Sequence, residues 1–333
     1  MRAVLIDRFG GPEVMYFGEI AIPDPGPGMV QVRMACASVN PADWKSRAGW
    51  IVGQPNYAPV FPLVVGFDGA GTVHKVGEGV TRVRVGQRVA LWTSQRAGRW
   101  GSYAEYVNTI EDATAVIPDN VSFEQAATVP IAAQTAWQDV FYPDRGALAA
   151  GHKVFIHGGS GGVGSYAIQF ARDAGVHVAT SCSKGNHAYV RELGAELTLD
   201  YRTEDLVKRV QEWAPEGVHA VIDAVGINSL PRSLEMIRPG GTLVRIATLD
   251  ASDHEGQTAE VAAKVGKRSL IARRAHADSA KELDHIFALI GAGKVKPPPI
   301  EVLPIEEVAI AHRRVEEGHV RGKLVLRIEK ALA

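Results

Sequence analysis

The chain has 333 residues, 46% of them hydrophobic and 22% charged, and its formal net charge at pH 7 is -1. Domains of ordinary size divide a chain of this length into about two. A near-neutral chain without a cluster of Lys and Arg argues against a nucleic acid or an anionic membrane as partner. Its two cysteines, Cys36 and Cys182, are too few for a disulfide framework or a cysteine-rich zinc lobe.

Short strands separated by turns are predicted from the N-terminus to about residue 120. The first residues, MRAVLID, alternate like a strand and do not resemble a secretory signal, and the longest apolar stretches are only strand-length. We therefore expect a cytoplasmic protein. Further strand candidates, bounded by turn residues, lie at 30–40, 69–77, 86–92 and 101–107.

Beyond residue 123 the pattern changes to alternating helices and strands. Helical periodicity covers residues 123–141, with no internal breaker beyond Pro130. This alternation is typical of βαβ units, so we predict an α/β fold with a doubly wound parallel sheet. The strand candidates are 153–157, 176–181, 196–199, 218–223 and 242–248, and helical stretches at 164–174, 186–193 and 204–213 separate them.

The C-terminal part of the chain combines a helix, a break and a strand. A helix from about Ser279 ends at GAGK, residues 291–294, and the prolines of KPPP then break the chain. Residues 306–328 are predicted as a helix and a strand, which we expect to return to the first domain because termini often lie close together. The predicted domains are 1–123, completed by 296–333, and 124–295.

Gly159, Gly161 and Gly164 form a G-x-G-x-x-G pattern between the strand 153–157 and a helix that begins near Gly162. In this context the glycines permit a tight turn, close approach of a pyrophosphate and close packing of helix on strand. Free N–H groups and the positive end of the helix dipole would then face the phosphates. The alternative is an ordinary glycine-rich turn. The predicted cofactor loop is Gly159, Ser160, Gly161, Gly162, Val163 and Gly164.

The choice between the two nicotinamide dinucleotides depends on the end of the next strand, where an acid would hold a ribose 2′-hydroxyl. No carboxylate occurs between Asp173 and Glu192. Ser181, Ser183 and Lys184 instead offer hydroxyl donors and a cation to a phosphate, so we predict NADPH rather than NADH as the cofactor. The alternative interpretation is that Lys184 is a solvated loop lysine.

Five motifs lie along the chain: GAGTVHKVGEGVTRVRVGQRVAL (69–91), GGSGGVG (158–164), RELGAELTLDY (191–201), RPGGTLV (238–244) and GHVRGKLVL (318–326). Together they resemble the medium-chain dehydrogenase/reductase superfamily across essentially the whole chain, and its zinc-independent quinone oxidoreductase branch in particular. The resemblance implies a GroES-like β-barrel domain, a Rossmann domain, and a cleft where nicotinamide meets substrate.

The resemblance also bears on metal binding. Zinc-dependent members have a Cys ligand near the position of Asn40 and a His ligand at the position of Phe67, and neither residue here can bind zinc. The histidines show no paired ligand spacing. We therefore predict that no metal is bound.

NPADWK, residues 40–45, resembles the NPxDxK segment of plant enone and alkenal reductases. The resemblance implies that Asn40 and Asp43 shape the site and that Lys45 holds the nicotinamide ribose or polarises the substrate carbonyl. Asn40 before Pro41 is also a good turn starter, and Asp43 is also suited to capping a helix. Many quinone reductases have Tyr where Lys45 stands, so their substrate preference does not transfer.

Further positions follow from the same resemblance. Thr135 matches a Thr near the nicotinamide, although it is equally an ordinary helix-interior Thr. Tyr201 matches a Tyr at the adenosine phosphate, although it is equally a strand-end aromatic. Val225 and Gly226 follow the strand 218–223, at the sheet edge where cofactors bind. Trp50 and Tyr57, in the Gly/Pro-rich loop 48–62, are candidate substrate walls or plain packing residues.

The resulting prediction is an NADPH-dependent oxidoreductase that transfers hydride to a quinone or an α,β-unsaturated carbonyl without zinc. In such a reaction negative charge develops on oxygen, and one donor aimed there is worth roughly 3 to 4 kcal/mol. The alternatives are a 2-enoyl thioester reductase and a non-catalytic NADPH-binding, crystallin-like protein. The expected partner is a small-molecule substrate, and by analogy the protein is a homodimer.

Overall fold

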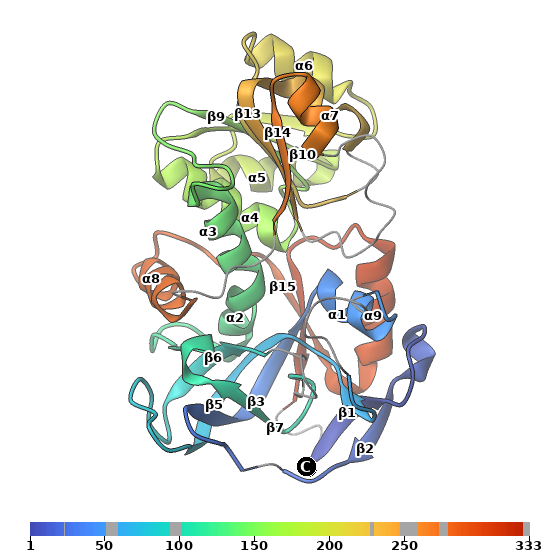
Figure 1. Ribbon diagram of the computed structural model, residues 1–333, viewed down its shortest axis with the longest axis vertical. Coiled ribbons are helices and arrows are strands. Elements are labelled where there is room, and N and C mark those ends of the chain that lie inside the picture. The colour runs from blue at the N-terminus through green and yellow to red at the C-terminus, as the bar shows by residue number, and fades with distance from the viewer. Residues whose placement is uncertain are drawn as a thin grey trace. The chain divides into compact units, whose positions relative to one another are not determined.

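The computed structural model describes residues 1–22, 24–50, 59–93, 101–226, 230–246, 259–272 and 279–328. It divides into two compact units, residues 1–134 with 276–333, and residues 135–275 (Figure 1). The two units are described separately below.

The first unit is built on a seven-stranded sheet in which, among the described residues, all strand pairings but one are antiparallel. The strand order is β15 (Ile300–Pro304), β16 (Lys323–Arg327), β3 (Met29–Val39), β5 (Asp68–Val76), β6 (Arg88–Trp92) and β8 (Thr114–Val116), and β7 (Tyr106–Ile110) pairs with β3. A smaller sheet contains β2 (Tyr16–Glu19), β1 (Arg2–Ile6) and β4 (Leu63–Val64). Strands rich in valine and leucine bury one continuous apolar cluster between these elements.

Short helices cover the first unit. The helix α1 follows β3 directly, and α1 and α9 pack side by side (Figure 1). The elements are α1 (Pro41–Arg47), α2 (Phe123–Ala127), α8 (Ser279–Gly291) and α9 (Val308–Glu317), with short turns η1 (Pro12–Val14), η3 (Glu111–Ala113), η4 (Val129–Ala133) and η8 (Ile305–Glu307).

The C-terminal strand lies in the first sheet, where β16 pairs antiparallel with β3 and Leu324 stands opposite Val39. Residues 124–134 and 279–295, which the sequence assigned to the second domain, belong to the first unit. Gln134 Nε2 donates to Glu282 Oε2 at 2.7 Å, and Trp92 Nε1 donates to Ser279 Oγ at 2.9 Å. The predicted domain limits stay a prediction.

The second unit is a six-stranded parallel sheet in the order β11 (Leu197–Asp200), β10 (His177–Cys182), β9 (Lys153–His157), β12 (Val218–Asp223), β13 (Ile237–Ile246) and β14 (Arg268–Ala272). In chain order this is 3-2-1-4-5-6, the doubly wound order of a dinucleotide-binding sheet. The α/β fold with a parallel sheet, predicted from the alternating pattern, is confirmed. The remaining elements are α3 (Gln134–Phe141), α4 (Gly162–Asp173), η5 (Lys184–Asn186), α5 (His187–Leu193), α6 (Leu206–Trp213), η6 (Leu230–Met236) and α7 (Ala259–Lys264).

The helical pattern predicted over residues 123–141 is interrupted in the structure. A π-helical turn, η4, separates α2 from α3 and contains Pro130. Proline has no N–H to continue the hydrogen-bond ladder, so the helix changes its winding there. None of the helices in the described ranges has the length and apolar character needed to span a membrane.

Candidate functional site

The glycine-rich loop joins β9 to α4 in the second unit. Gly158 has a φ of 72°, in the left-handed region that favours glycine. The loop closes through a hydrogen bond from Gly161 N to Gly158 O at 3.0 Å, and Gly161 is the N-cap of α4. The first N–H groups of this 12-residue helix therefore start directly at the loop.

The glycines of this loop have two different tasks. A Cβ at Gly164 would lie 2.4 Å from the carbonyl oxygen of Gly158, and one at Gly159 would lie 2.1 Å from Thr180 Oγ1. At these two positions the protein's own atoms occupy the space that a Cβ would need, so glycine permits the packing of loop, helix and strand. A Cβ at Gly161 meets nothing closer than Gly158 O, at 3.3 Å. Gly161 is thus the position whose open side a ligand can approach.

The loop after β10 is tied to the glycine-rich loop by Asn186, a residue that the sequence analysis did not single out. Asn186 Nδ2 donates to Ser160 Oγ at 3.2 Å and to Ser183 Oγ at 3.1 Å. Because both hydroxyl oxygens accept from this amide, their own O–H hydrogens remain to be donated elsewhere. An Asn that caps α5 gives no sequence signal for this bridging contact.

Ser181 differs from the other two predicted phosphate contacts. Its side chain is buried, and its Oγ lies 3.4 Å from His157 Nδ1. Ser183 is half-buried and Lys184 is exposed, at the start of η5. Of these three residues, only Ser183 and Lys184 are therefore accessible at the surface of the loop.

Three other predicted cofactor residues of the second unit, Tyr201, Val225 and Gly226, lie at the carboxyl ends of its parallel strands, the edge where such sheets bind nucleotides. Tyr201 follows β11, is 41% exposed and lies under the Arg202 guanidinium, 5.4 Å from the ring centroid. Val225, 57% exposed, and Gly226 follow β12, and Asp223 Oδ1 accepts both of their N–H groups. Thr135 is buried at the start of α3.

In the first unit, Asn40 and Asp43 form the N-terminal cap of α1. Asn40 N donates to Asp43 Oδ2 at 2.6 Å, and Asp43 N donates back to Asn40 O at 3.0 Å. Asp43 has no exposed surface and Asn40 is 3% exposed. The structure therefore contains the contacts that the capping interpretation requires. A direct role of either residue in catalysis stays a prediction.

The Asn40 side chain lies between a buried cation and a buried anion. Lys323 Nζ donates to Asn40 Oδ1 at 2.5 Å and to Val39 O at 3.0 Å. On its other side, Asn40 Nδ2 donates to Asp68 Oδ1 at 2.9 Å. Asp68 also accepts from Ser38 Oγ at 2.7 Å and from the N–H of Ile131 at 3.1 Å. Lys323 is 5% exposed and Asp68 is fully buried, so this arrangement is internal.

A second arm of buried polar groups leads from Asp43 toward α9. Tyr103 Oη donates to Asp43 Oδ2 at 3.1 Å, and His312 Nε2 lies 3.3 Å from Tyr103 Oη. Arg47 Nη1 lies 3.0 Å from His312 Nδ1, and Arg47 Nη2 pairs with the Glu316 carboxylate. Arginine only donates, so His312 Nδ1 accepts and its Nε2–H points to Tyr103. Burial, reinforced by the Arg47 charge, lowers the pKa of His312 to about 3, so this imidazole is neutral.

The charges in this region are not balanced one to one. Burial, reinforced by the charge of Asp68, raises the pKa of Asp43 to about 7. Burial also raises the pKa of Asp68, against the opposing effect of Lys323, and lowers the pKa of Lys323. Asp43 Oδ1 has no hydrogen-bond partner among the described residues. One ammonium thus faces two carboxylates, and burial together with the charge of Asp68 favours the protonated form of Asp43.

Lys45 lies on α1 beside two tryptophans. Its Nζ is 5.7 Å from the Trp44 ring centroid and 5.6 Å from that of Trp50, and the two rings meet edge to face at 4.9 Å. Lys45 and Trp50, both predicted, are therefore brought together, and Trp44 was missed although it precedes Lys45 in the chain. Trp50 is 39% exposed. The other predicted substrate wall, Tyr57, lies outside the described residues.

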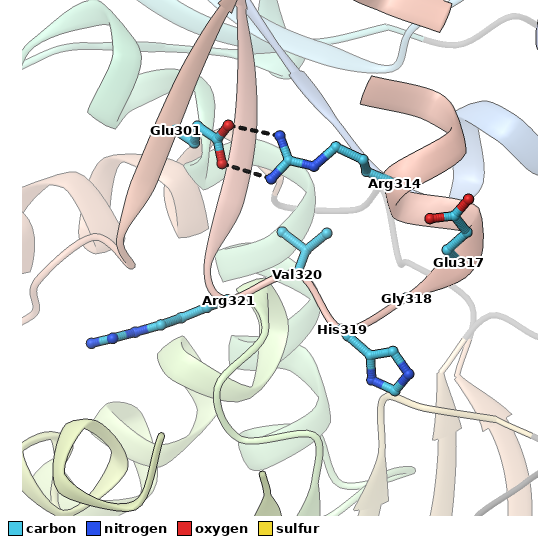
Figure 2. A pocket seen from close by; sticks show the side chains of 7 residues that line it. All are labelled: Glu301, Arg314, Glu317, Gly318, His319, Val320 and Arg321. Carbon is cyan, nitrogen blue, oxygen red and sulfur yellow. Dashed lines mark hydrogen bonds and ion pairs between the residues drawn. The ribbon is translucent and has the colours of Figure 1, made fainter. Parts of the chain in front are cut away.

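A pocket of about 320 Å³ opens elsewhere in the first unit, between α9, β15 and the turn before β16. Figure 2 shows the Arg314 guanidinium facing the Glu301 carboxylate, to which it donates two hydrogen bonds of 2.7 Å. None of the predicted site residues lines this pocket. Its lining consists of Glu301, Arg314, Glu317, Gly318, His319, Val320 and Arg321.

Residues 26–119 match the family model of the alcohol dehydrogenase GroES-like domain, and residues 193–326 match that of the zinc-binding dehydrogenase. A quinone oxidoreductase of Pseudomonas aeruginosa is 31% identical over 98% of this chain and 99% of its own length. An NADPH-dependent alkenal/one oxidoreductase of Arabidopsis thaliana is 31% identical over 98% of this chain and 79% of its own. The structure of the Escherichia coli quinone oxidoreductase complexed with NADPH is 26% identical, has a TM-score of 0.87 and covers 98% of this chain and 100% of that one.

A doubly wound parallel sheet with a glycine-rich loop, together with a GroES-like unit, defines an NAD(P)-binding dehydrogenase or reductase. The chain belongs to the medium-chain dehydrogenase/reductase superfamily, and its relatives include quinone oxidoreductases and an alkenal/one oxidoreductase. The resemblance seen in the sequence motifs is confirmed.

The name of one matching family model raises the question of zinc, and the residues present do not fit it. Asn40 Oδ1, at the position near the cysteine ligand of zinc-dependent members, already accepts from the Lys323 ammonium. Phe67 offers no donor atom in place of histidine. Within the described ranges, no three His, Cys, Asp or Glu side chains are grouped so that they could hold a metal ion.

Proposed function

We propose that the protein is an NADPH-dependent reductase of quinones or α,β-unsaturated carbonyls that works without zinc. The observation that carries the proposal is the Asn186 bridge, which joins the glycine-rich loop to the loop of Ser183 and the exposed Lys184 and leaves the hydroxyl hydrogens of Ser160 and Ser183 to be donated to a ligand. The names of the Arabidopsis and Pseudomonas relatives and the NADPH complex of the Escherichia coli structure support the same assignment.

The backbone of the glycine-rich loop is proposed to hold the cofactor's pyrophosphate at the N-terminus of α4. Gly161 leaves room for it, and the free N–H groups of the first helical turn, with the helix dipole, favour its negative charge. Ser183 and Lys184 are proposed to donate to the 2′-phosphate, and Tyr201 to lie against the adenosine. A carboxylate in this loop would repel that phosphate, and residues 174–191 contain none.

The bound cofactor supplies the hydride, and the protein supplies orientation and charge stabilisation. We assign Lys45 as the donor to the substrate oxygen on which negative charge develops during hydride transfer. One positioned donor at such an oxygen is worth roughly 3 to 4 kcal/mol. Trp44 and Trp50 hold this ammonium by cation–π contact, and the exposed face of Trp50 suits a planar acceptor. Asn40 and Asp43 are buried, so we assign them to shaping the site from the protein interior.

The test is oxidation of NADPH and of NADH, each with a quinone, an enone and a 2-enoyl thioester. We expect oxidation of NADPH with the quinone or the enone and much slower oxidation of NADH. Preference for the thioester would move the protein to the 2-enoyl thioester reductases, and no oxidation with any acceptor would leave a non-catalytic NADPH-binding protein. The predicted homodimer and cytoplasmic location belong to this proposal, and light scattering of the purified protein tests the first.

A further inference from the structure

The buried ammonium of Lys323 has no role in the proposed hydride transfer. Lys323 is the first residue of β16, and its Nζ donates to Asn40 Oδ1 and Val39 O, 283 and 284 residues away in the chain. We propose that Lys323 is a positioning residue for Lys45: by holding Asn40 it fixes the first turn of α1, and so the place of the Lys45 ammonium. This inference rests on the proposed reductase function.

The β-sheet holds Lys323 in place at the start of β16. The pairing of β16 with β3 sets Leu324 opposite Val39, the residue before Asn40. Lys323 N also donates to Pro299 O at 2.9 Å. The backbone on both sides of the Lys323–Asn40 hydrogen bond is therefore fixed by the sheet, and the ammonium stands at a defined point against the start of α1.

The helix α1 depends on contacts at its ends. It has seven residues, and isolated helices of this length are not stable in water. At its N-terminus, the Asn40 side chain is held by Lys323 on one side and by Asp68 on the other. Asn40 N in turn donates to Asp43 Oδ2, within the first turn. Loss of the ammonium would leave Asn40 Oδ1 without its donor and the two carboxylates without their cation.

The first turn of α1 and the Lys45 ammonium are linked through the short helix. Asp43 and Lys45 are two residues apart on α1, and Trp50 N donates to Lys45 O at 2.9 Å. A rotation or fraying of the first turn would therefore move Lys45 and its two tryptophan neighbours together. A misplacement of about 1 Å at a reacting group can lower a rate by about a hundredfold.

The kinetic test is a double-mutant cycle with Lys323→Met, Lys45→Met and the double variant. We expect Lys323→Met to lower kcat about tenfold or more and to leave KM for NADPH within about twofold. In the Lys45→Met background the same change should lower kcat by less than about twofold, because its effect passes through Lys45. Equal factors in both backgrounds, or wild-type kcat in Lys323→Met, would overturn the proposal.

A matched control and a milder variant complete the kinetic test. Lys153 Nζ donates to Trp213 O at 2.7 Å and lies 4.8 Å from the Trp213 ring, in the second unit. Lys153→Met therefore removes a comparable lysine contact and should leave kcat unchanged. Lys323→Gln, which keeps a donor for Asn40 Oδ1, should retain more activity than Lys323→Met, and less activity would count against the proposal.

A measurement without turnover separates this inference from the proposed function. In protein labelled with 5-fluorotryptophan, Trp44→Phe and Trp50→Phe identify the two resonances next to Lys45. Lys323→Met, or Lys323→Gln if the Met variant does not fold, should shift these two resonances, whereas Lys153→Met should shift that of Trp213. Unchanged Trp44 and Trp50 resonances would refute the positioning role even if no acceptor were reduced. A shift without any turnover would reject the reductase function alone.

Discussion

Two alanine substitutions in the glycine-rich loop separate its packing task from its binding task. In Gly164→Ala the new Cβ would lie 2.4 Å from Gly158 O and 2.7 Å from Gly159 Cα, both backbone atoms that have little room to move. Overpacking of this kind costs up to about 3 kcal/mol, and the better helix propensity of alanine returns about 1 kcal/mol. We expect Gly164→Ala to lower the free energy of unfolding by about 2 kcal/mol.

Gly161→Ala should weaken NADPH binding and leave the free energy of unfolding nearly unchanged. Its φ of -82° and ψ of 179° suit any residue, and the nearest atom to the new Cβ is 3.3 Å away. Alanine is a poorer N-cap than glycine by less than about 1 kcal/mol, so stability should change little. The methyl group would, however, occupy the open side of the loop that the pyrophosphate approaches. We expect the Kd for NADPH to rise about tenfold, which corresponds to about 1.4 kcal/mol.

The assays are urea unfolding for both variants and titration of NADPH by calorimetry. If Gly161→Ala binds NADPH as tightly as the wild type, the loop does not contact the phosphates. If Gly164→Ala is as stable as the wild type, the close backbone approach does not constrain the fold as argued here.

Other substitutions test the remaining assignments. Lys184→Glu should raise the Kd for NADPH about tenfold and that for NADH much less, because only NADPH carries the 2′-phosphate; equal effects in parallel titrations would remove this account of cofactor choice. Lys45→Ala should lower kcat about a hundredfold with the quinone or enone, and unchanged turnover in initial-rate assays would reject its role. Asp43, whose pKa burial raises from 3.8 to about 7, binds a proton in the folded state that the unfolded state has released. Its contribution to stability is therefore complete below pH 3.8 and is lost as the pH rises through about 7. Asp43→Asn should flatten this part of the pH profile of urea unfolding, and an unchanged slope would contradict a raised pKa. Elemental analysis should find no stoichiometric zinc, and a chelator should leave the initial rate unchanged.

Local patterns predicted most of the second unit, although its sixth strand, β14 (Arg268–Ala272), was not among the five predicted strands. The alternation of strands and helices and the spacing of Gly159, Gly161 and Gly164 depend on neighbouring residues, and the parallel sheet with its loop was predicted from them. The helical pattern over 123–141, with Pro130 as its internal breaker, is present as α2 and α3 with the π-helical turn η4 between them, and periodicity alone does not report how Pro130 changes the winding.

The buried charges of the first unit could not be predicted in the same way. Lys323 and Asn40 are 283 residues apart, and only the pairing of β16 with β3 brings them together. For Asp43, capping and site roles use the same residue type at the same spacing, so the sequence left both open. Asn186 was missed for a similar reason, because its contacts with Ser160 and Ser183 join two loops that follow neighbouring strands.

The central claim, that the protein passes hydride from NADPH to an activated acceptor, is tested most directly by isotope transfer. NADPH deuterated at C4 of the nicotinamide, in each of its two stereochemical forms, is mixed with the protein and an enone, and the product is examined by NMR. We predict deuterium at the β-carbon of the saturated ketone from one form only. Turnover without deuterium in the product from either form, or no reduction of enone or quinone, would contradict the claim.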